Sequence, residues 1–161
     1  MRSRRWKLTL RLKRKSYLTQ ISIFYLSSFA FVLFVLPFIY LTDKILGENS
    51  NGPEAGAWIA TVLVTPFFET FLFQRLPFNR MQNWSLTRNK YGLYILVSSV
   101  IFALCHYYSL QYMMITFAGG LVLAYTYFFY CKTPKVAFCT TVLIHGLRNS
   151  MALIALIFDK R

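Results

Sequence analysis

The sequence predicts an all-α protein, built as a polytopic transmembrane helical bundle of about five spans. The first observation behind this prediction is composition: 57% of the 161 residues are hydrophobic and only 14% are charged, whereas soluble domains carry about 25% charged residues. The second is that the apolar residues form runs close to the ~20 residues that a membrane-spanning helix needs. The alternating pattern of β-barrel strands is absent, so helices are the expected way to pair the backbone inside lipid.

Five apolar runs divide the chain. They cover residues 17–42, 57–78, 91–108, 112–130 and 136–158. We therefore expect three parts: a basic cytoplasmic arm over residues 1–16, a first transmembrane helix over residues 17–42, and a four-helix membrane core over residues 57–158.

Lysine and arginine account for 18 residues and give the chain a formal net charge of +13. Eight of these 18 residues precede the first apolar run, and most of the others lie beside later runs. Positive charge that flanks membrane spans marks the cytoplasmic side, so we expect an integral protein of a bacterial plasma membrane with its N-terminus in the cytoplasm. The basic arm is expected to contact anionic lipid. No nucleic acid is expected as a partner, because no recognition motif accompanies the charge.

The connecting segments agree with this orientation. Residues 43–54 are turn-rich and slightly acidic, which indicates an external loop. Residues 79–90 and 131–135 are basic and are predicted to be cytoplasmic. The 3 cysteines are odd in number and form no C-x-x-C pair, so the sequence indicates neither a disulfide framework nor a zinc ribbon.

One acidic residue, Glu69, lies inside a predicted span, while the other acids lie in the loop or near the C-terminus. A carboxylate at this depth costs roughly 2.5–3.5 kcal/mol, which makes it a candidate for function. The only 2 histidines, His106 and His145, also lie in predicted spans. A single polar residue of this kind is often only hydrogen-bonded within the bundle, whereas three of them on three spans favour a shared site.

Helical spacing places two further polar residues near this site. His145 and Asn149 are four residues apart and share a helix face. Arg148 either lines the same cavity or snorkels toward lipid phosphate. Glu69 and His145 are each about 14 Å from the inner ends of their spans, at 1.5 Å per residue, so we expect them at a similar depth.

A carboxylate, two imidazoles and an amide together suit hydrolysis. The carboxylate can accept a proton from water, and imidazole and amide N–H groups can stabilise an oxyanion. Two other uses of the same residues remain open. One acid and two histidines can make a His₂Glu zinc site, although the H-E-x-x-H motif is absent. Intramembrane acids and histidines also serve as proton relays in transporters.

Three short motifs carry a resemblance to a known family. In chain order they are Glu69–Gln74, Phe102–His106 and His145–Asn149, on successive predicted spans. They resemble the E-E-x-x-x-R, F-x-x-x-H and H-x-x-x-N motifs of the CAAX protease and bacteriocin-processing family, also called the Abi family. The resemblance covers roughly residues 57–158, and three motifs in order are far more specific than one alone.

The resemblance implies a glutamic intramembrane endopeptidase that needs no metal and no other cofactor. By this resemblance, Glu69 is the base that activates a water molecule. His106 holds and polarises that water, while His145 and Asn149 form the oxyanion site.

Four supporting residues complete the expected site, namely Thr70, Gln74, Phe102 and Arg148. Thr70 and Gln74 stand where the family usually has a second Glu and an Arg. A neutral pair four residues apart then replaces an ion pair, which removes two charges from the membrane interior.

We therefore expect an intramembrane endopeptidase that cleaves a membrane-associated peptide or protein, of the kind that processes prenylated CAAX proteins or bacteriocins. A catalytically inactive membrane scaffold or bacteriocin self-immunity protein is the first alternative. A small proton-coupled transporter is the second, and the absence of a visible sequence repeat argues against a repeat-built transporter.

Overall fold

The computed structural model describes residues 11–46 and 59–159, and every regular element within these ranges is helical. The elements are α2 (Tyr17–Leu46), η1 (Ala60–Val64), α3 (Thr65–Glu69), η2 (Thr70–Arg75), α4 (Leu76–Asn83), α5 (Tyr91–Leu104), α6 (Leu110–Phe129) and α7 (Pro134–Asp159). The prediction of an all-α membrane bundle is confirmed. In the described part of the chain, 3 segments are long and apolar enough to cross a membrane: Tyr17–Leu41, Leu110–Phe129 and Pro134–Ile154.

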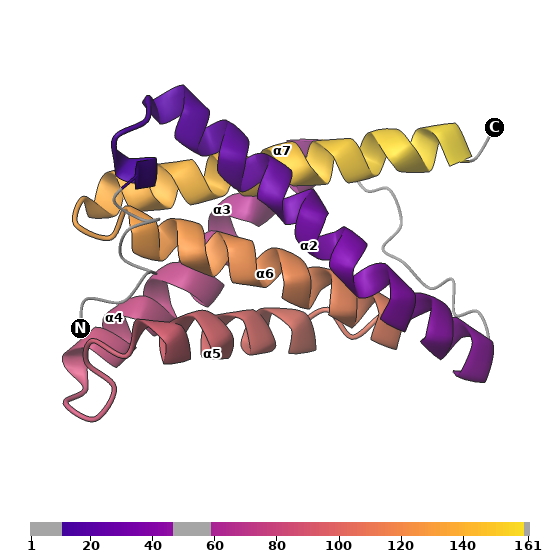
Figure 1. The fold of residues 1–161 in the computed structure, drawn as a ribbon, viewed down its shortest axis with the longest axis horizontal. Helices are drawn as coiled ribbons and strands as arrows, with labels where there is room; N and C mark the ends of the chain where they lie inside the picture. The colour runs from indigo at the N-terminus through magenta and orange to yellow at the C-terminus, as the bar shows by residue number, and fades with distance from the viewer. Residues whose placement is uncertain (1–10, 47–58, 160–161) are drawn as a thin grey trace.

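Helix α6 lies at the centre of the bundle. Helices α2 and α7 pack against it from one side and α5 from the other (Figure 1). Small buried residues on α6, including Ala118, Gly120 and Ala124, let the neighbouring helices approach closely, as is usual where helices associate in lipid. Large apolar side chains on α2, such as Leu33 and Phe34, are exposed and suit contact with lipid.

The predicted span over residues 57–78 is not one regular helix. It consists of two wide π-helical turns, η1 and η2, which alternate with the short helices α3 and α4. Each π-helical turn ends just before a helix with proline at its second position, Pro66 in α3 and Pro77 in α4. Proline lacks the N–H that would bond the carbonyl four residues earlier and its ring clashes with that carbonyl. Each π-helical turn therefore lies where proline interrupts the regular series of backbone hydrogen bonds between residues four apart.

The predicted span over residues 91–108 ends earlier than expected. Helix α5 stops at Leu104, and the chain turns before α6, with the backbone N–H of His106 donating to the carbonyl of Ala103 at 2.9 Å. The Ser109 hydroxyl then caps α6 by accepting a hydrogen bond from the backbone N–H of Tyr112 at 3.1 Å. His106 thus lies in a turn and not within a helix, because α5 has already ended at Leu104 and the Ser109 cap starts α6 at Leu110.

Polar contacts join the start of α2 to the other helices. The Tyr17 hydroxyl lies 2.6 Å from the Thr140 hydroxyl of α7, and the Tyr130 hydroxyl donates to Oε1 of Gln20 at 2.5 Å. These contacts hold the first span against the core. Most of the predicted basic arm (residues 1–10) and most of the predicted external loop (residues 47–54) lie outside the described residues.

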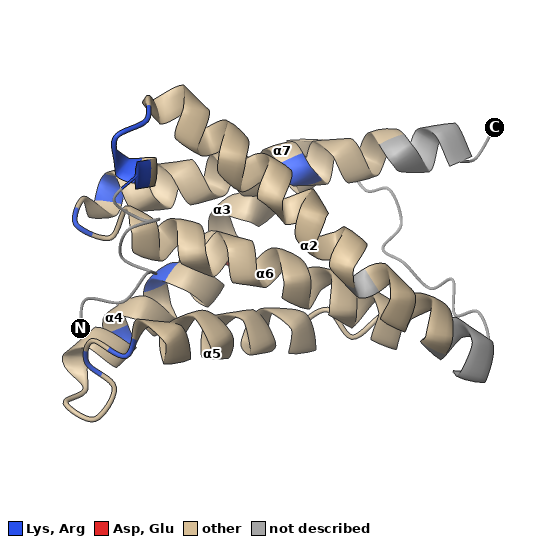
Figure 2. Ribbon diagram, viewed as in Figure 1, with Lys and Arg blue, Asp and Glu red and all other residues tan. Residues whose placement is uncertain are grey.

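The Lys and Arg residues that are coloured in Figure 2 gather at one end of the bundle, apart from Arg148. They lie before α2, around α4 and the turn to α5, and at the turn between α6 and α7. By the positive-inside rule, this end is predicted to face the cytoplasm.

Site-directed labelling tests this orientation. In a background without the three native cysteines, Arg88→Cys is expected to react with a membrane-impermeant maleimide in inside-out vesicles only. Asn51→Cys, in the predicted external loop, is expected to react in right-side-out vesicles only. Labelling of Arg88→Cys from the outside would contradict the predicted orientation.

Candidate active site

Glu69 is the last residue of α3 and lies between the two π-helical turns. Thr61 and Thr65 precede it at intervals of four residues, and all three line one cavity. This stripe of polar residues at helical spacing was a usable signal in the sequence, and we had not predicted the two threonines. Turns of π-helix recur at functional sites in other proteins.

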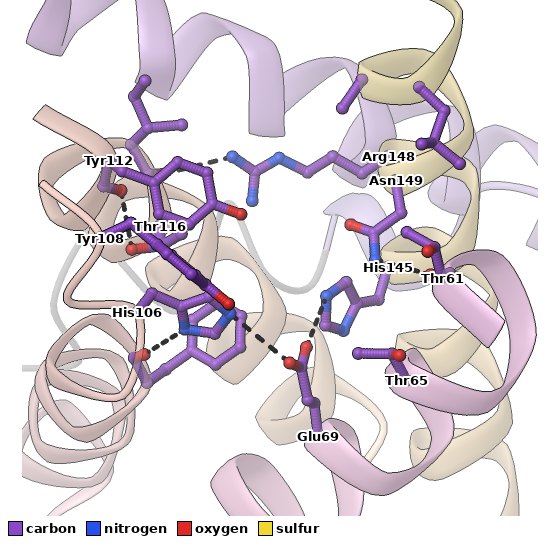
Figure 3. Close-up of a pocket in the computed structure, with 14 residues that line it drawn as sticks. Thr61, Thr65, Glu69, His106, Tyr108, Tyr112, Thr116, His145, Arg148 and Asn149 are labelled. Carbon is purple, nitrogen blue, oxygen red and sulfur yellow. Dashed lines mark hydrogen bonds and ion pairs between the residues drawn. The ribbon is translucent and has the colours of Figure 1, made fainter. Parts of the chain in front are cut away.

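The Glu69 carboxylate contacts both imidazoles. Its Oε1 lies 3.5 Å from Nε2 of His106, and its Oε2 lies 3.3 Å from Nε2 of His145 (Figure 3). The Glu69 side chain retains 19% of its exposure, against 14% for His106 and 3% for His145. The three polar residues, from α3, the α5–α6 turn and α7, therefore meet at one place. The sequence analysis expected this because each of them lies within an apolar run.

The His106 ring has one nitrogen committed to the backbone. Its Nδ1 lies 2.6 Å from the carbonyl oxygen of Phe102, which can only accept a hydrogen bond, so Nδ1 carries the proton. In the neutral ring, Nε2 then presents a lone pair toward Glu69. Two acceptors 3.5 Å apart repel each other unless they share a donor. A water molecule beside the pair can donate one hydrogen to each of them.

His145 occupies the opposite side of the carboxylate and is almost fully buried. Its Nδ1 has no hydrogen-bond partner. Because an orphaned buried N–H is rarer than an orphaned acceptor, we assign the proton to Nε2, where it is donated toward Glu69. This N–H is also available to a negatively charged oxygen that forms beside the carboxylate.

Asn149 lines the same cavity, one helical turn beyond His145. Its Nδ2 donates one hydrogen bond to the carbonyl oxygen of Thr61 at 3.0 Å, which fixes the amide and leaves its second N–H for another acceptor. The contact depends on a close approach of η1 to α7: a Cβ added at Gly146 would lie 2.6 Å from the carbonyl oxygen of Val62. Only an α-hydrogen fits there, as in a Cα–H···O contact.

The cavity has a volume of about 320 Å³, near the lower end for ligand pockets. Of the predicted site residues, it is lined by Glu69, Phe102, His106, His145, Arg148 and Asn149. The cavity is also lined by Tyr108, Tyr112 and Thr116, which were not among the predicted site residues. Tyr112 and Thr116 are four residues apart on α6, a spacing that could have found them, whereas Tyr108 lies in the turn before α6 and carries no such signal.

Thr70 and Gln74 are not among the cavity-lining residues. Both are fully buried, and their side-chain oxygen and nitrogen atoms have no hydrogen-bond partner. They are four residues apart within the π-helical turn η2 but do not bond to each other, since the wider turn does not bring such positions directly above one another. The two residues of the predicted neutral pair are therefore both buried, but no hydrogen bond joins them.

A zinc site was the rival use of these side chains. Among the described residues, no group of three or more His, Cys, Asp or Glu side chains is placed to hold a metal ion. The ordered contacts in the site are between the carboxylate, the imidazoles and backbone carbonyl groups.

The fold and the cavity define a polytopic helical membrane protein with a carboxylate–imidazole cluster in its interior. A family model described as type II CAAX prenyl endopeptidase Rce1-like matches residues 51–151, which is more than half of the chain. The chain belongs to this Rce1-like family of CAAX-type intramembrane endopeptidases, which confirms the resemblance found in the motifs. Comparisons with curated proteins and with solved structures found no match.

The approach of η1 to α7 can be tested at Gly146. We expect Gly146→Ala to lower the free energy of unfolding by about 1–3 kcal/mol, the usual cost of overpacking, measured by thermal unfolding in detergent. Gly92→Ala is the matched control, because a Cβ at Gly92 meets nothing within 4 Å. Equal melting temperatures for the two variants would contradict the close contact.

The buried Thr70 hydroxyl generates a second prediction. Thr70→Val keeps the shape and removes an unpartnered polar atom, so we expect it to raise the free energy of unfolding by about 1–3 kcal/mol. Thr126→Val is the control, because the Thr126 hydroxyl donates to the carbonyl of Val122 at 2.8 Å. That variant should be neutral or less stable, and a loss of stability in Thr70→Val would show that its hydroxyl has a partner.

Proposed function

We propose that this protein is a glutamic intramembrane endopeptidase, in which a Glu69-bound water molecule cleaves a peptide bond. The observation that carries the proposal is the contact of one carboxylate with two imidazoles at a cavity, at 3.5 and 3.3 Å, in a segment that the sequence predicts to lie in the membrane. Family membership supports the same reaction class.

The first step is the activation of water. The water molecule donates one hydrogen to Oε1 of Glu69 and the other to Nε2 of His106. Because Nδ1 of His106 is tied to the Phe102 carbonyl, the ring is held with its lone pair toward the water. Glu69 accepts a proton as the water oxygen attacks the substrate carbonyl carbon, and general base catalysis of this kind contributes about 10²–10⁴-fold.

The second step stabilises and then resolves the tetrahedral intermediate. The Nε2–H of His145 and the free amide N–H of Asn149 donate to the oxyanion, since both residues line the cavity that Glu69 also lines. Glu69 then returns its proton to the leaving amine, the C–N bond breaks, and a carboxylic acid and an amine are released. No redox partner is required.

The substrate class follows from the location of the site. Peptide bonds reach this cavity only when a segment enters the membrane-embedded bundle, so we propose a lipid-anchored peptide such as a prenylated CAAX segment. The description of the family model supports this class over a bacteriocin leader.

A catalytically inactive scaffold is the second candidate, and one observation favours it. Thr70 and Gln74 are neutral and unpartnered where the family usually has an ion pair. In such a scaffold, the cavity binds a membrane-associated peptide without cleaving it. The two candidates differ only in whether a product forms.

Purified protein incubated with a farnesylated CAAX peptide tests the proposal. We expect cleavage that persists in EDTA and falls at least about 10²-fold in Glu69→Gln, because the amide cannot accept the proton from water. Product formation is measured by mass spectrometry, and thermal unfolding verifies that the variant is folded.

Glu48→Gln is the matched control, since Glu48 precedes the residues matched by the family model. It is expected to retain wild-type activity. Cleavage that survives Glu69→Gln, or that is lost in EDTA and restored by zinc, would overturn the glutamic mechanism. Tight peptide binding without any product would favour the scaffold.

A further inference from the structure

Arg148 is a cation held inside the bundle. It lies on α7 and lines the same cavity as Glu69, with the guanidinium on the side of the cavity formed by α6 (Figure 3). Its Nη2 donates to the carbonyl oxygen of Ile115 at 3.2 Å. The side chain therefore crosses to α6 and does not extend along α7 toward the membrane surface, as a snorkelling arginine would.

A glycine makes room for this guanidinium. A Cβ added at Gly119 of α6 would lie 1.5 Å from Nη1 of Arg148 and 2.3 Å from its Cζ. The guanidinium thus lies against the backbone of α6, in a space that any larger residue at position 119 would fill. Its position is fixed by the backbone before any ligand arrives.

The charge of Arg148 lacks an anionic partner in the described part of the chain. The ion pairs found there join Glu69 to His106 and His145, and none involves Arg148. A guanidinium has five N–H donors, and the contact with Ile115 uses one of them. A cation at membrane depth is costly unless paired, so the cavity is prepared for an anionic group.

The shape of the cavity restricts what this anion can be. Arg148 is three residues beyond His145 on α7, which is about 4.5 Å along the helix axis, and an extended peptide advances about 3.3 Å per residue. An anion at Arg148 is therefore only a few residues from a peptide bond at Glu69. In a peptide, a planar carboxylate is the group that matches a guanidinium in a bidentate contact.

We propose that Arg148 binds a substrate carboxylate, which positions the peptide bond that lies a few residues before it against Glu69. This inference rests on the proposed endopeptidase function and adds a specificity-determining residue to it. The carboxylate comes from either a free C-terminus or an acidic side chain close to it. Tyr112, which lines the same wall of the cavity, can add a hydroxyl donor to the same group.

Three peptides distinguish the sources of the carboxylate. All carry S-farnesylcysteine followed by three residues: one ends in a free acid, one in a C-terminal amide, and one in an amide with aspartate as its last residue. We expect the wild-type protein to prefer the free acid over the plain amide by about 10–100-fold in kcat/KM, the size expected for hydrogen bonds to a charged group. If the aspartyl amide matches the free acid, a side-chain carboxylate also satisfies the site.

Two variants test the residue itself. In Arg148→Gln, the ratio of acid to amide cleavage should fall toward one. Gly119→Ala should reduce the same ratio without removing any charge, because the new methyl group displaces the guanidinium. Arg80→Gln is the matched control: Arg80 is exposed on α4 and does not line the cavity, so both rates and their ratio should remain unchanged.

Binding to the Glu69→Gln protein separates this inference from the proposed reaction. The dissociation constants of the acid and amide peptides are measured by calorimetry, with Arg148 intact and replaced by Gln. Acid-selective binding that requires Arg148 supports the inference even if the wild-type protein cleaves nothing. Equal affinity for acid and amide, or an equal loss for both in Arg148→Gln, would overturn it and leave Arg148 as a tie between α6 and α7.

Discussion

The cost of placing a carboxylate inside a membrane is the constraint on which this structure depends. An ionised acid at that depth must have partners, because lipid supplies none. Glu69 has a donor in the Nε2–H of His145, and a water molecule that donates to both Glu69 and Nε2 of His106 would link it to the second ring. The contacts that make the carboxylate tolerable in the membrane also hold three chemically active groups around one cavity. Stability and the proposed catalysis thus depend on the same cluster.

The irregular backbone around Glu69 is tolerated for a related reason. Backbone groups released from a regular helix must be satisfied by protein when no water is present. The hydroxyl of Ser98 donates to the carbonyl of Phe73, the carbonyl that Pro77 cannot bond, and the Asn149 amide donates to the carbonyl of Thr61. These donors belong to neighbouring helices. The hydrogen bonds that satisfy these free carbonyl groups therefore also join the segment that carries Glu69 to the helices α5 and α7.

Few charged side chains lie in the described interior of this bundle. Thr70 and Gln74 fill positions of a usual ion pair with neutral groups, so the charged side chains that line the described cavity are Glu69 and Arg148. They do not pair with each other. The carboxylate is paired with imidazoles and the guanidinium with a backbone carbonyl. The separation of Glu69 from Arg148 suits a site in which Glu69 acts on a peptide bond and Arg148 recognises an anion of the same substrate.

The sequence alone determined the fold class and the identity of the central residues. Lipid imposes long apolar runs, and it makes each polar residue within them conspicuous, so Glu69, His106 and His145 stood out without any coordinates. Approximate helix positions followed for the same reason. The stripe of Thr61 and Thr65 was visible at helical spacing but carries no charge, and it was missed.

Only the tertiary structure decided how these residues are arranged. The turn that carries His106 depends on a serine cap, and the wide turns around Glu69 depend on donors from other helices. The orientation of Arg148 depends on the absence of a side chain at Gly119 on another helix. The serine cap is local, but the other contacts join residues that are distant in the chain. A periodic pattern in the sequence indicates only which residues share a face of one helix. The physical reason is that packing between helices, and not local propensity, fixes where a long side chain can extend.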